Sequence, residues 1–463
     1  MPARDEDRCR ARVRRPSLTD HRDRGVCGVN GGVGSKRGEG ALLVGLVVPG
    51  DAPSGEPPLS ELGRLVETAG AVVLGTTFQK RSRLHPATCV GAGKAEEIGR
   101  MAAALACDVV IFDRDLSPAQ VRNLERIANR RVVDRSELIL DIFAQRARTR
   151  QARVQVELAQ LEYTRPRLRR LWTHLSRIEG GIGMRGPGEK QIESDRRALR
   201  RRIQALRDEL SAIERQQGTR AAGRRDYFNV SLVGYTNVGK STLLSALTGA
   251  DAFIEDRLFA TLDTTTRAWA LPGGKRVFLS DTVGFIRGLP HHLVASFHAT
   301  LAEARDADLL LHVVDASSPD AERQTDTVIE VLEEIGADHV PVLTVLNKVD
   351  RLGDRVALAA LHPRAGRAVV VSARTGEGIR ELESAVLGHM EGSQVEVDVI
   401  ADPGDGRLLA FLAEKGRILF QDYPSAGEAR VRVRLPRKYA EKLRTEGRRV
   451  LDAASSSPAD PAR

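Results

Sequence analysis

The sequence predicts a multidomain α/β protein on the basis of three observations. Apolar, strand-length runs alternate with amphipathic helices over residues 41–135, and again around a phosphate-loop pattern over residues 227–390. Arg-rich helical segments lie between these regions, over residues 136–217. This alternation is typical of α/β domains, and 463 residues allow two to four domains. We therefore expect an N-terminal α/β domain, an antiparallel helical hairpin, a second α/β domain with a mostly parallel sheet, and a small α+β C-terminal domain.

Composition favours a polyanionic partner and a reducing compartment. The formal net charge is +9, and residues 146–225 hold 21 Lys and Arg against nine Asp and Glu, a net of +12. Aromatic residues make up only 4%, which argues against an aromatic stacking platform. The apolar runs are too short to span a membrane, so no stable membrane insertion is expected. The cysteines form no paired motif and are interpreted as free cytoplasmic thiols: Cys9, Cys27, Cys89 and Cys107.

The N-terminal domain follows a head of residues 1–40 that is basic, lacks apolar periodicity and is expected to be disordered. Within the domain, Ser117 is suited to cap a helix, because Pro118 favours the first turn and Gln120 can reach back to the cap residue. The expected strands cover residues 41–48, 71–75, 108–112 and 131–134, and the expected helices cover residues 58–69, 94–104 and the segment after Ser117.

Residues 136–217 predict an antiparallel helical hairpin, because two narrow apolar seams flank a Gly-rich turn. Pro166 is expected to kink the first helix near its middle. The many Arg side chains are explained equally well as a solvated surface, but the excess of one charge favours RNA or another polyanion. The seams consist of Val154, Leu158, Leu161, Leu168 and Trp172, and of Leu199, Ile203, Leu206, Leu210 and Ile213.

The turn "GGIGMRGPGEK" at residues 180–190 matches a dinucleotide-binding pattern but fails its context. Such a loop must follow a strand and open a helix within a βαβ unit, whereas this one lies between two helices. The glycines are better explained by backbone that passes close to another molecule, with Arg185 and Lys190 supplying positive charge. These two residues are candidates for RNA contact, and a flexible turn without such a role is the alternative.

After a polar linker at residues 218–226, "FNVSLVGYTNVGKST" carries the strongest motif. It satisfies G-x-x-x-x-G-K-[ST], with an apolar strand before it and an amphipathic helix after it. Backbone N–H groups of such a loop surround phosphate oxygens, Lys240 adds charge at the β- and γ-phosphates, and the Ser241 hydroxyl can ligate Mg²⁺. The candidate phosphate-binding residues are Gly234, Tyr235, Thr236, Asn237, Val238, Gly239, Lys240 and Ser241.

Three later strand ends predict that the nucleotide is GTP. Asp281 ends an apolar strand where a carboxylate would hold Mg²⁺ through water, and the Gly284 N–H can contact a γ-phosphate. Asp350 can accept two hydrogen bonds from guanine N1–H and its 2-amino group, which adenine cannot offer. Another strand places Ser372 beside the guanine edge. The candidates in these elements are Asp281, Thr282, Val283, Gly284, Asn347, Lys348, Val349, Asp350, Ser372, Ala373 and Arg374.

The loop "FATLDTTTR" at residues 259–267 lies where a GTPase keeps the threonine that senses γ-phosphate and Mg²⁺. From the pattern alone, the threonines between Thr261 and Thr266 all remain candidates. A second feature is that Phe285 follows Gly284, where many GTPases have a Gln that orients the attacking water. Because Phe cannot hydrogen-bond water, we expect slow hydrolysis until a partner orders the site, and the catalytic group is unknown.

The remaining chain predicts a small α+β domain over residues 391–450. "RILFQDYP" and "ARVRVRLP" have strand-like patterns, and Gly406–Lys415 is expected to be helical. A disordered tail is expected over residues 451–463.

These motifs resemble those of the HflX family of ribosome-associated GTPases, in the translation-factor-like class of P-loop GTPases. The similarity runs from about residue 41 to 390 and includes "GYTNVGKST", "LFATLD", "DTVGFIRGLP" and "NKVD". The segments "LSPAQVRNLE", "VQVELAQLEYTRPRL" and "GGIGMRGPGEKQIESDRR" are more diagnostic, because many NTPases share the phosphate loop. The C-terminal module is less similar.

The resemblance implies a protein that binds and hydrolyses GTP with Mg²⁺ and associates with the large (50S) ribosomal subunit, splitting or rescuing stalled or idle ribosomes. It also implies that Thr261 is the Mg²⁺-sensing threonine, so that Ser241 and Thr261 are the metal-ligand candidates. Thr264 and Lys190 depart from the family pattern, which usually has Pro and Thr at these positions. The loop residues added to the GTP-binding set are Phe259, Ala260, Thr261, Leu262 and Asp263.

Two other functions stay open. One is a signalling switch that binds a protein effector, which predicts binding insensitive to RNase. The other is an RNA-remodelling ATPase with a regulatory GTPase domain, which predicts RNA-stimulated ATP turnover that survives Lys240→Ala. Some members of the resembled family use ATP through the N-terminal domain, but this sequence has no adequate phosphate loop there. We expect a cytoplasmic monomer that binds GTP and GDP.

Overall fold

The computed structural model describes residues 38–49, 55, 57–167, 187–222, 227–249, 258–259, 261, 264–287, 298–353, 368–425 and 427–452. These residues fall within one compact unit and form three β-sheets, as the alternation of strands and helices predicted. No helix in this part of the chain is long and apolar enough to cross a membrane. Residues 1–37 of the predicted head and residues 453–463 of the predicted tail lie outside the described residues.

The N-terminal sheet has the order β2-β1-β3-β4, and all its strands are parallel. Successive residues of β1 point to opposite faces of the sheet, and Leu42 and Leu43 accordingly belong to two different hydrophobic clusters. Both faces of the sheet are therefore covered. Ser117 and Gln120 form the predicted capping box at the start of α3. The elements are β1 (Gly40–Val47), α1 (Ser60–Ala69), β2 (Val72–Lys80), α2 (Ala92–Ala104), β3 (Val109–Phe112), α3 (Pro118–Ala128) and β4 (Arg131–Asp134).

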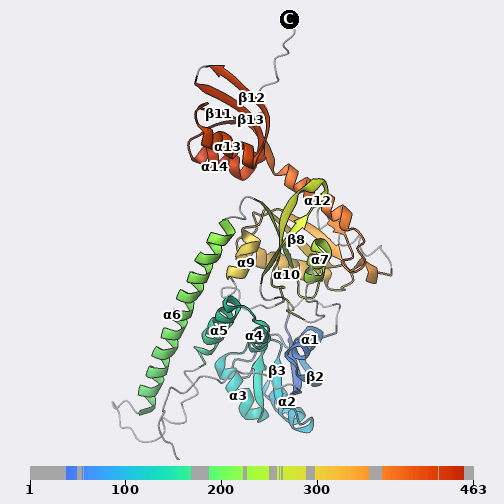
Figure 1. Ribbon diagram of the computed structural model, residues 1–463. Coiled ribbons are helices and arrows are strands. Elements are labelled where there is room, and N and C mark those ends of the chain that lie inside the picture. The colour runs from blue at the N-terminus through green and yellow to red at the C-terminus, as the bar shows by residue number, and fades with distance from the viewer. Residues whose placement is uncertain are drawn as a thin grey trace, which may run out of the picture. The chain divides into compact units, whose positions relative to one another are not determined.

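Helices α5 (Arg150–Thr164) and α6 (Pro187–Ala222) pack together through part of the predicted apolar seam, and Figure 1 shows α6 as a single long helix. Leu168 and Trp172 of that seam lie outside the described residues, and Ile213 is not part of the buried cluster. They run antiparallel, because Arg150 pairs with Glu209 near one end and Arg202 pairs with Glu157 further along. The preceding helix α4 (Arg135–Arg146) lies mostly within the range expected for the hairpin, residues 136–217, and contacts both α1 and α5.

Two local expectations about the hairpin were wrong. Helix α5 ends at Thr164, so Pro166 follows a helix end and does not kink the middle of α5. Proline lacks an N–H donor, so the helical series of hydrogen bonds stops at Pro166, although Arg165 before it still has helical backbone angles. Helix α6 also continues to Ala222, so the first part of the expected linker, residues 218–222, is helical. Arg and Ala, which are good helix formers, end this segment.

The phosphate-loop domain contains a six-stranded sheet of order β10-β9-β8-β5-β7-β6. Only β6 is antiparallel to its neighbour, so the carboxyl ends of the central strands meet at one edge. The elements are β5 (Phe228–Gly234), α7 (Lys240–Thr248), β6 (Thr265–Ala270), η2 (Pro272–Gly274), β7 (Arg276–Asp281), α9 (His298–Arg305), β8 (Leu309–Asp315), α10 (Ala321–Glu334), β9 (Val342–Asn347), η3 (Val349–Arg351), β10 (Ala368–Val370) and α12 (Ile379–Gly392).

The C-terminal domain is an antiparallel sheet of order β12-β13-β11-β14 with two helices on one face (Figure 1). Val431 and Val433 of β13 are buried with these helices, while Arg430 and Arg432 alternate with them and pair with Asp398. Strand β14 reaches Asp452, so residues 451–452 are not part of a tail as expected. The elements are β11 (Gln394–Ala401), α13 (Gly406–Lys415), β12 (Arg417–Ser425), β13 (Glu428–Pro436), α14 (Arg437–Thr445) and β14 (Arg449–Asp452).

One hydrophobic cluster extends through both the N-terminal domain and the phosphate-loop domain. It includes Leu62 of α1 and Leu138 of α4 together with Leu243 of α7. Phe143 of α4 meets Phe259 edge-to-face, with ring centroids 4.6 Å apart. Because protein interiors are closely packed, a displacement of side chains in one of these two domains requires repacking of the side chains that the other domain contributes to the shared core.

Candidate nucleotide-binding site

The phosphate loop joins β5 to α7 in the predicted strand–loop–helix context. Strand β5 ends at Gly234 and α7 begins at Lys240. Gly239 has a φ of 95°, and a Cβ built there would lie 2.4 Å from Asn347 Nδ2, so only glycine fits without displacement. The N-terminal end of α7, with its unpaired N–H groups and positive dipole end, therefore faces the loop, which is an arrangement that binds phosphate.

Lys240 is buried beneath this loop, with 7% of its surface exposed. Its Nζ donates to the backbone oxygens of Gly234 at 3.0 Å and of Tyr235 at 2.8 Å. Burial lowers the pKa of Lys240 to about 8, although the nearby Asp281 carboxylate acts in the opposite direction. The two backbone carbonyls only partly replace the water that the Lys240 ammonium loses on burial. A phosphate group bound at this loop would therefore stabilise the charged form of Lys240 further.

Oxygen ligands from three different elements meet beside the loop. Ser241 Oγ lies 2.7 Å from Thr261 Oγ1, and Asp281 Oδ2 accepts hydrogen bonds from Ser241 at 2.7 Å and Thr261 at 3.0 Å. The other carboxylate oxygen of Asp281 is buried with no hydrogen-bond partner among the described residues. Burial raises the pKa of Asp281, while Lys240 lowers it. Two hydroxyls and a carboxylate are hard oxygen ligands, and this set fits Mg²⁺.

A second cluster forms where β9 and β10 end. Asn347 Nδ2 donates to the backbone oxygen of Val238 at 2.8 Å, and its Oδ1 accepts from the Ala373 N–H at 3.0 Å. Ser372 donates to Asp350 Oδ1 at 2.7 Å. Asn347 and Ser372 are buried, whereas Asp350 is exposed. The buried Asn347 thus connects the phosphate loop to the loop after β10, and the buried Ser372 orients Asp350. The Asp350 carboxylate remains at the surface, where it can accept hydrogen bonds from a nucleotide base.

Lys348 extends back over the phosphate loop. Its Nζ donates to the Asn237 backbone oxygen at 2.6 Å and pairs with Asp315 at 2.7 Å. Asp315 was not among the residues predicted from the sequence, although its position carried a signal. Asp315 ends the buried strand β8 beside β5, and ligands bind at the carboxyl ends of such strands.

The segment after β7 is held against the phosphate loop by its backbone. The Phe285 N–H donates to the Gly234 oxygen at 3.1 Å, and the Phe285 oxygen accepts from the Thr236 N–H at 2.7 Å. The Phe285 side chain is 1% exposed and belongs to the shared core, so it contributes packing rather than a polar contact. The Thr236 hydroxyl is buried without a hydrogen-bond partner in the described residues, as expected where a ligand supplies one.

The structure discriminates among the candidate threonines. Thr261 reaches the Ser241 and Asp281 oxygens, whereas Thr265 and Thr266 belong to β6, where the Thr266 hydroxyl bonds Ser280. Other predicted residues cannot be placed: Ala260, Leu262, Asp263 and Arg185 lie outside the described residues, and the Lys190 side chain in α6 is not described.

Family models match three consecutive parts of the chain. The model described as "GTP-binding GTPase N-terminal" matches residues 56–144, and "GTP-binding GTPase Middle Region" matches residues 146–224. The model described as "50S ribosome-binding GTPase" matches residues 229–348, which include the phosphate loop, the Ser241–Thr261–Asp281 cluster and Asn347.

Relatives match over most of the chain. GTPase HflX of Magnetococcus marinus is 50% identical over 355 residues, covering 76% of this chain and 82% of the relative. GTPase HflX of Escherichia coli is 45% identical over 408 residues, covering 86% and 94%. A crystal structure of SsGBP in complex with GDP is 25% identical, covers 76% of this chain and 98% of that one, and has a TM-score of 0.43. The identity to the two HflX relatives, over most of their length, shows that the chain belongs to the HflX family of GTPases, which bind and hydrolyse GTP.

Proposed function

We propose that this GTPase uses Mg²⁺ to bind and hydrolyse GTP, binds the large (50S) ribosomal subunit, and splits or rescues stalled or idle ribosomes. The convergence of Ser241, Thr261 and Asp281 beside the phosphate loop supports the nucleotide chemistry. The match to a model described as a 50S ribosome-binding GTPase supports the ribosomal partner. In this proposal the protein acts as a cytoplasmic monomer.

Each part of the site has a role in this proposal. Ser241 and Thr261 would ligate Mg²⁺, and Asp281 would hold it through water. Mg²⁺ held in this way would supply positive charge against the phosphates. The GTP-binding residues would be those of the phosphate loop, Gly234 to Ser241, of the loop Phe259 to Asp263, of Asp281 to Gly284, of Asn347 to Asp350, and of Ser372 to Arg374.

In this proposal different side chains and backbone groups bind the phosphates and the base of the nucleotide. Lys240 and the N–H groups of the phosphate loop would hold the phosphates, and the Gly284 N–H would donate to the γ-phosphate. Asp350, oriented by Ser372, would accept from guanine and so select GTP over ATP. Because Phe285 is buried, its side chain would not orient the attacking water. The proposal therefore requires a partner, the ribosome, to complete the site.

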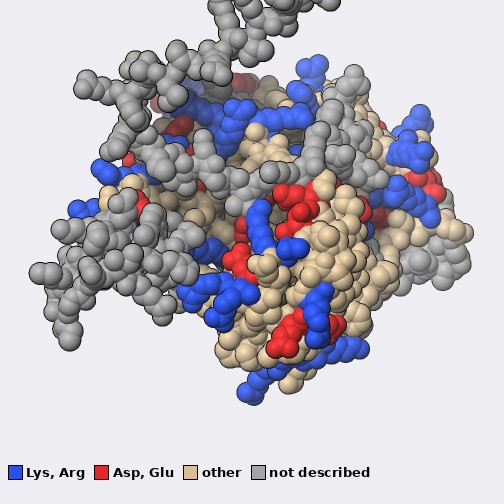
Figure 2. Space-filling view, turned by 90° about the horizontal axis from the view of Figure 1, so that it is seen from below, with Lys and Arg blue, Asp and Glu red and all other residues tan. Residues whose placement is uncertain are grey.

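A basic groove supports contact with RNA. It has a volume of 630 Å³ and lies between the N-terminal end of α3 and the two hairpin helices. Arg165, Arg196 and Arg200 line it, and none of the three has an ion-pair partner among the described residues. Unpaired arginines beside a helix N-terminus attract phosphate groups. Figure 2 shows Lys and Arg side chains in several groups on the face seen from below, with acidic side chains between them.

Co-sedimentation with ribosomes tests this proposal. The chain is mixed with 70S ribosomes or 50S subunits plus GDP, ATP or a non-hydrolysable GTP analogue, and the gradients are analysed for bound protein and free subunits. We expect binding to 50S and an increase in free subunits only with the GTP analogue. Lys240→Ala serves as the nucleotide-binding control, and absence of nucleotide-dependent co-sedimentation contradicts the proposal.

The same preparation separates the two other functions. A protein-effector switch would retain its partner after RNase treatment, whereas ribosome binding would be lost. An RNA-remodelling ATPase would show RNA-stimulated ATP turnover that persists in Lys240→Ala. Among the described residues the arginines of the groove have no ion-pair partner, which favours the ribosomal function over the protein effector.

A further inference from the structure

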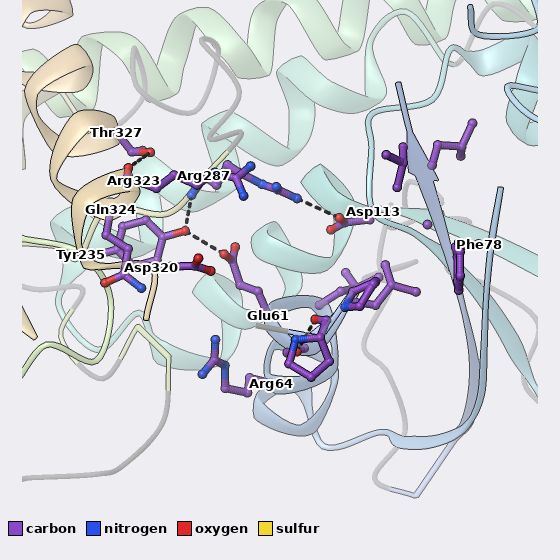
Figure 3. Close-up of a pocket in the computed structure, with 18 residues that line it drawn as sticks. Glu61, Arg64, Phe78, Asp113, Tyr235, Arg287, Asp320, Arg323, Gln324 and Thr327 are labelled. Carbon is purple, nitrogen blue, oxygen red and sulfur yellow. Dashed lines mark hydrogen bonds and ion pairs between the residues drawn. The ribbon is translucent and has the colours of Figure 1, made fainter. Parts of the chain in front are cut away.

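A cavity of 190 Å³ adjoins the phosphate loop. Tyr235, Thr236 and Asn237 line it from the loop, and Glu61 and Arg64 line it from helix α1 of the N-terminal domain. Figure 3 shows the neighbouring cavity, which the same two residues of α1 also line. The N-terminal domain therefore brings an arginine to the wall of a cavity whose opposite wall includes the phosphate loop.

The part of the loop that lines this cavity lies where the terminal phosphate of GTP is expected. The Thr236 N–H donates to the Phe285 oxygen at 2.7 Å, which places Thr236 beside Gly284, the proposed donor to the γ-phosphate. Thr236 is 6% exposed, and its hydroxyl has no hydrogen-bond partner among the described residues. Lys240 Nζ donates to the neighbouring Tyr235 oxygen. A group that enters the cavity from α1 thus approaches the γ-phosphate end of the nucleotide rather than its base.

Helix α1 is fixed against the phosphate loop by packing and by hydrogen bonds. Leu62 is fully buried in the core that the two domains share. Glu61 accepts a hydrogen bond from the Tyr235 hydroxyl at 2.7 Å and pairs with Arg135. Because residues three positions apart are neighbours on a helix surface, Arg64 lies beside Glu61. Figure 3 shows both side chains projecting from α1 toward the side on which Tyr235 lies.

The charges around the cavity suit an arginine that contacts phosphate. The two carboxylates in its wall have cationic partners of their own, because Glu61 pairs with Arg135 and Asp315 pairs with Lys348 at 2.7 Å. Arg64 is exposed, so its guanidinium can change rotamer without disturbing the core. A planar guanidinium can donate two parallel hydrogen bonds to phosphate oxygens. The Arg64 side chain can therefore turn toward a phosphate bound at the loop.

We propose that Arg64 is a catalytic residue, supplied by the N-terminal domain of the same chain, that stabilises the transition state of GTP hydrolysis. In this reaction the oxygen of water bonds the γ-phosphorus, and the bond to the bridging oxygen breaks with its electron pair remaining on GDP. The protons of water pass to inorganic phosphate and to solvent. The Arg64 guanidinium donates to the γ-phosphate as negative charge moves toward the bridging oxygen.

This role differs from that of the ribosomal partner. Arg64 stabilises charge and orients no water, so a partner is still required to order the attacking water. The inference rests on the proposed function, because it takes the γ-phosphate to lie at Lys240 and Gly284.

Arg64→Ala tests this role, because it removes the guanidinium at an exposed position. Hydrolysis of GTP by the full chain is followed in single turnover at saturating protein with Mg²⁺, with and without 50S subunits. We expect the rate constant to fall at least about tenfold. The dissociation constants of GDP and of a non-hydrolysable GTP analogue should stay within about twofold, because the lost contact forms mainly in the transition state. Arg64→Lys, which keeps the charge without the planar fork, should give an intermediate rate.

Arg323→Ala is the matched control. Arg323 of α10 lines the neighbouring cavity of 250 Å³ together with Arg64, but it does not line the cavity beside the phosphate loop. Its rate constant should equal that of the wild-type chain. Aluminium fluoride provides a second measurement, because with GDP it mimics the phosphoryl group in transfer. With 50S subunits present, it should tighten binding of fluorescent GDP to the wild-type and Arg323→Ala chains and tighten it less in Arg64→Ala.

An unchanged single-turnover rate constant in Arg64→Ala overturns the proposal, as does an equal fall in Arg323→Ala. A fall that is explained entirely by weaker binding of the GTP analogue also overturns it. If Arg64→Ala does not fold, Arg64→Gln, which is neutral and of similar length, decides by the same criteria. Lys240→Ala tests the phosphate site separately. Retained GTP binding in that variant contradicts the proposed nucleotide site, whereas the rates of the Arg64 variants decide only the catalytic arginine.

Discussion

The Ser372 hydroxyl donates a 2.7 Å hydrogen bond to Asp350 Oδ1 across 22 residues of chain. Ser372 is fully buried and Asp350 is exposed, so a fixed hydroxyl sets the direction of a surface carboxylate. This direction matters because a carboxylate recognises two neighbouring N–H groups only when its oxygens lie in their plane.

Asp350→Asn is expected to lose the preference for guanine, because an amide presents a donor where guanine also has a donor. The GTP-to-ATP affinity ratio should fall by at least about tenfold, or 1.4 kcal/mol. Competition of unlabelled GTP and ATP against fluorescent GDP measures this ratio. Ser372→Ala should lower it less, because the carboxylate remains. Full retention of discrimination in Asp350→Asn contradicts the assigned role.

Nucleotide affinity is expected to decrease as the pH rises above about 8. Burial lowers the pKa of Lys240 to about 8, so the free protein carries a charged Lys240 below this pH and a neutral one above it. Phosphate binding favours the charged form, so affinity falls by up to about tenfold per pH unit beyond the pKa. GDP titrations between about pH 6.5 and 9 measure the decline.

Two variants control for other titrating groups in this experiment. Lys240→Arg stays charged throughout the range, so its affinity should be lower but nearly independent of pH. Lys240→Ala should abolish nucleotide binding or turnover. A wild-type curve that is flat across pH 8 speaks against a lowered pKa at Lys240.

Introducing a glutamine at position 285, after Gly284, is not expected to accelerate GTP hydrolysis. Phe285 is 1% exposed in the shared core, so Phe285→Gln places a polar amide among apolar side chains. We expect a loss of about 3 kcal/mol in unfolding free energy and no acceleration of GTP hydrolysis. Phe285→Leu, which stays apolar, should lose less. Denaturant unfolding and single-turnover hydrolysis measure the two effects, and faster hydrolysis in a stable Phe285→Gln chain contradicts this interpretation.

Asp141 is expected to destabilise the fold at neutral and alkaline pH. Burial, followed by the charge of Glu137, raises the pKa of Asp141 to about 7. A carboxyl with a raised folded pKa contributes stability that is present below its ordinary pKa and lost as pH rises through about 7. Asp141→Asn should therefore raise the unfolding midpoint at pH 8 by about 2–4 °C and give no gain near pH 4. Thermal unfolding of Asp338→Asn, an exposed position, is the control.

The basic groove should contribute to the salt dependence of 50S binding. Replacing Arg165, Arg196 and Arg200 with Ala removes three charges that have no ion-pair partner among the described residues. If each contacts a phosphate, the slope of log affinity against log salt falls by about one per residue. GTP affinity should not change.

The matched control removes three exposed arginines from the C-terminal domain: Arg407, Arg417 and Arg437. Binding curves between about 50 and 200 mM salt compare the two triple variants. Equal slopes for both variants contradict a specific role of the groove.

The sequence alone predicted those parts of the protein that depend on short-range order. The phosphate loop was recognisable because Gly239 and Lys240 are contiguous with the strand and helix that position them. Ser117 and Gln120 predicted their capping box, since helix caps depend on residues three positions apart. The helix end near Pro166 and the helical residues 218–222 were misjudged, because seam periodicity and polarity do not locate helix ends.

Only the tertiary structure decided which distant side chains meet. The residue pattern alone left several threonines open; the family resemblance implied Thr261, and it is Thr261 whose hydroxyl approaches Asp281 in the structure. The structure also places Phe285 in a core shared by two domains. The Tyr235–Glu61 hydrogen bond joins residues 174 positions apart. No local pattern encodes such a pair, because it depends on how two separately formed layers pack against each other. Sequence chemistry thus predicted what the phosphate loop binds, and packing determined which distant residues contact that loop.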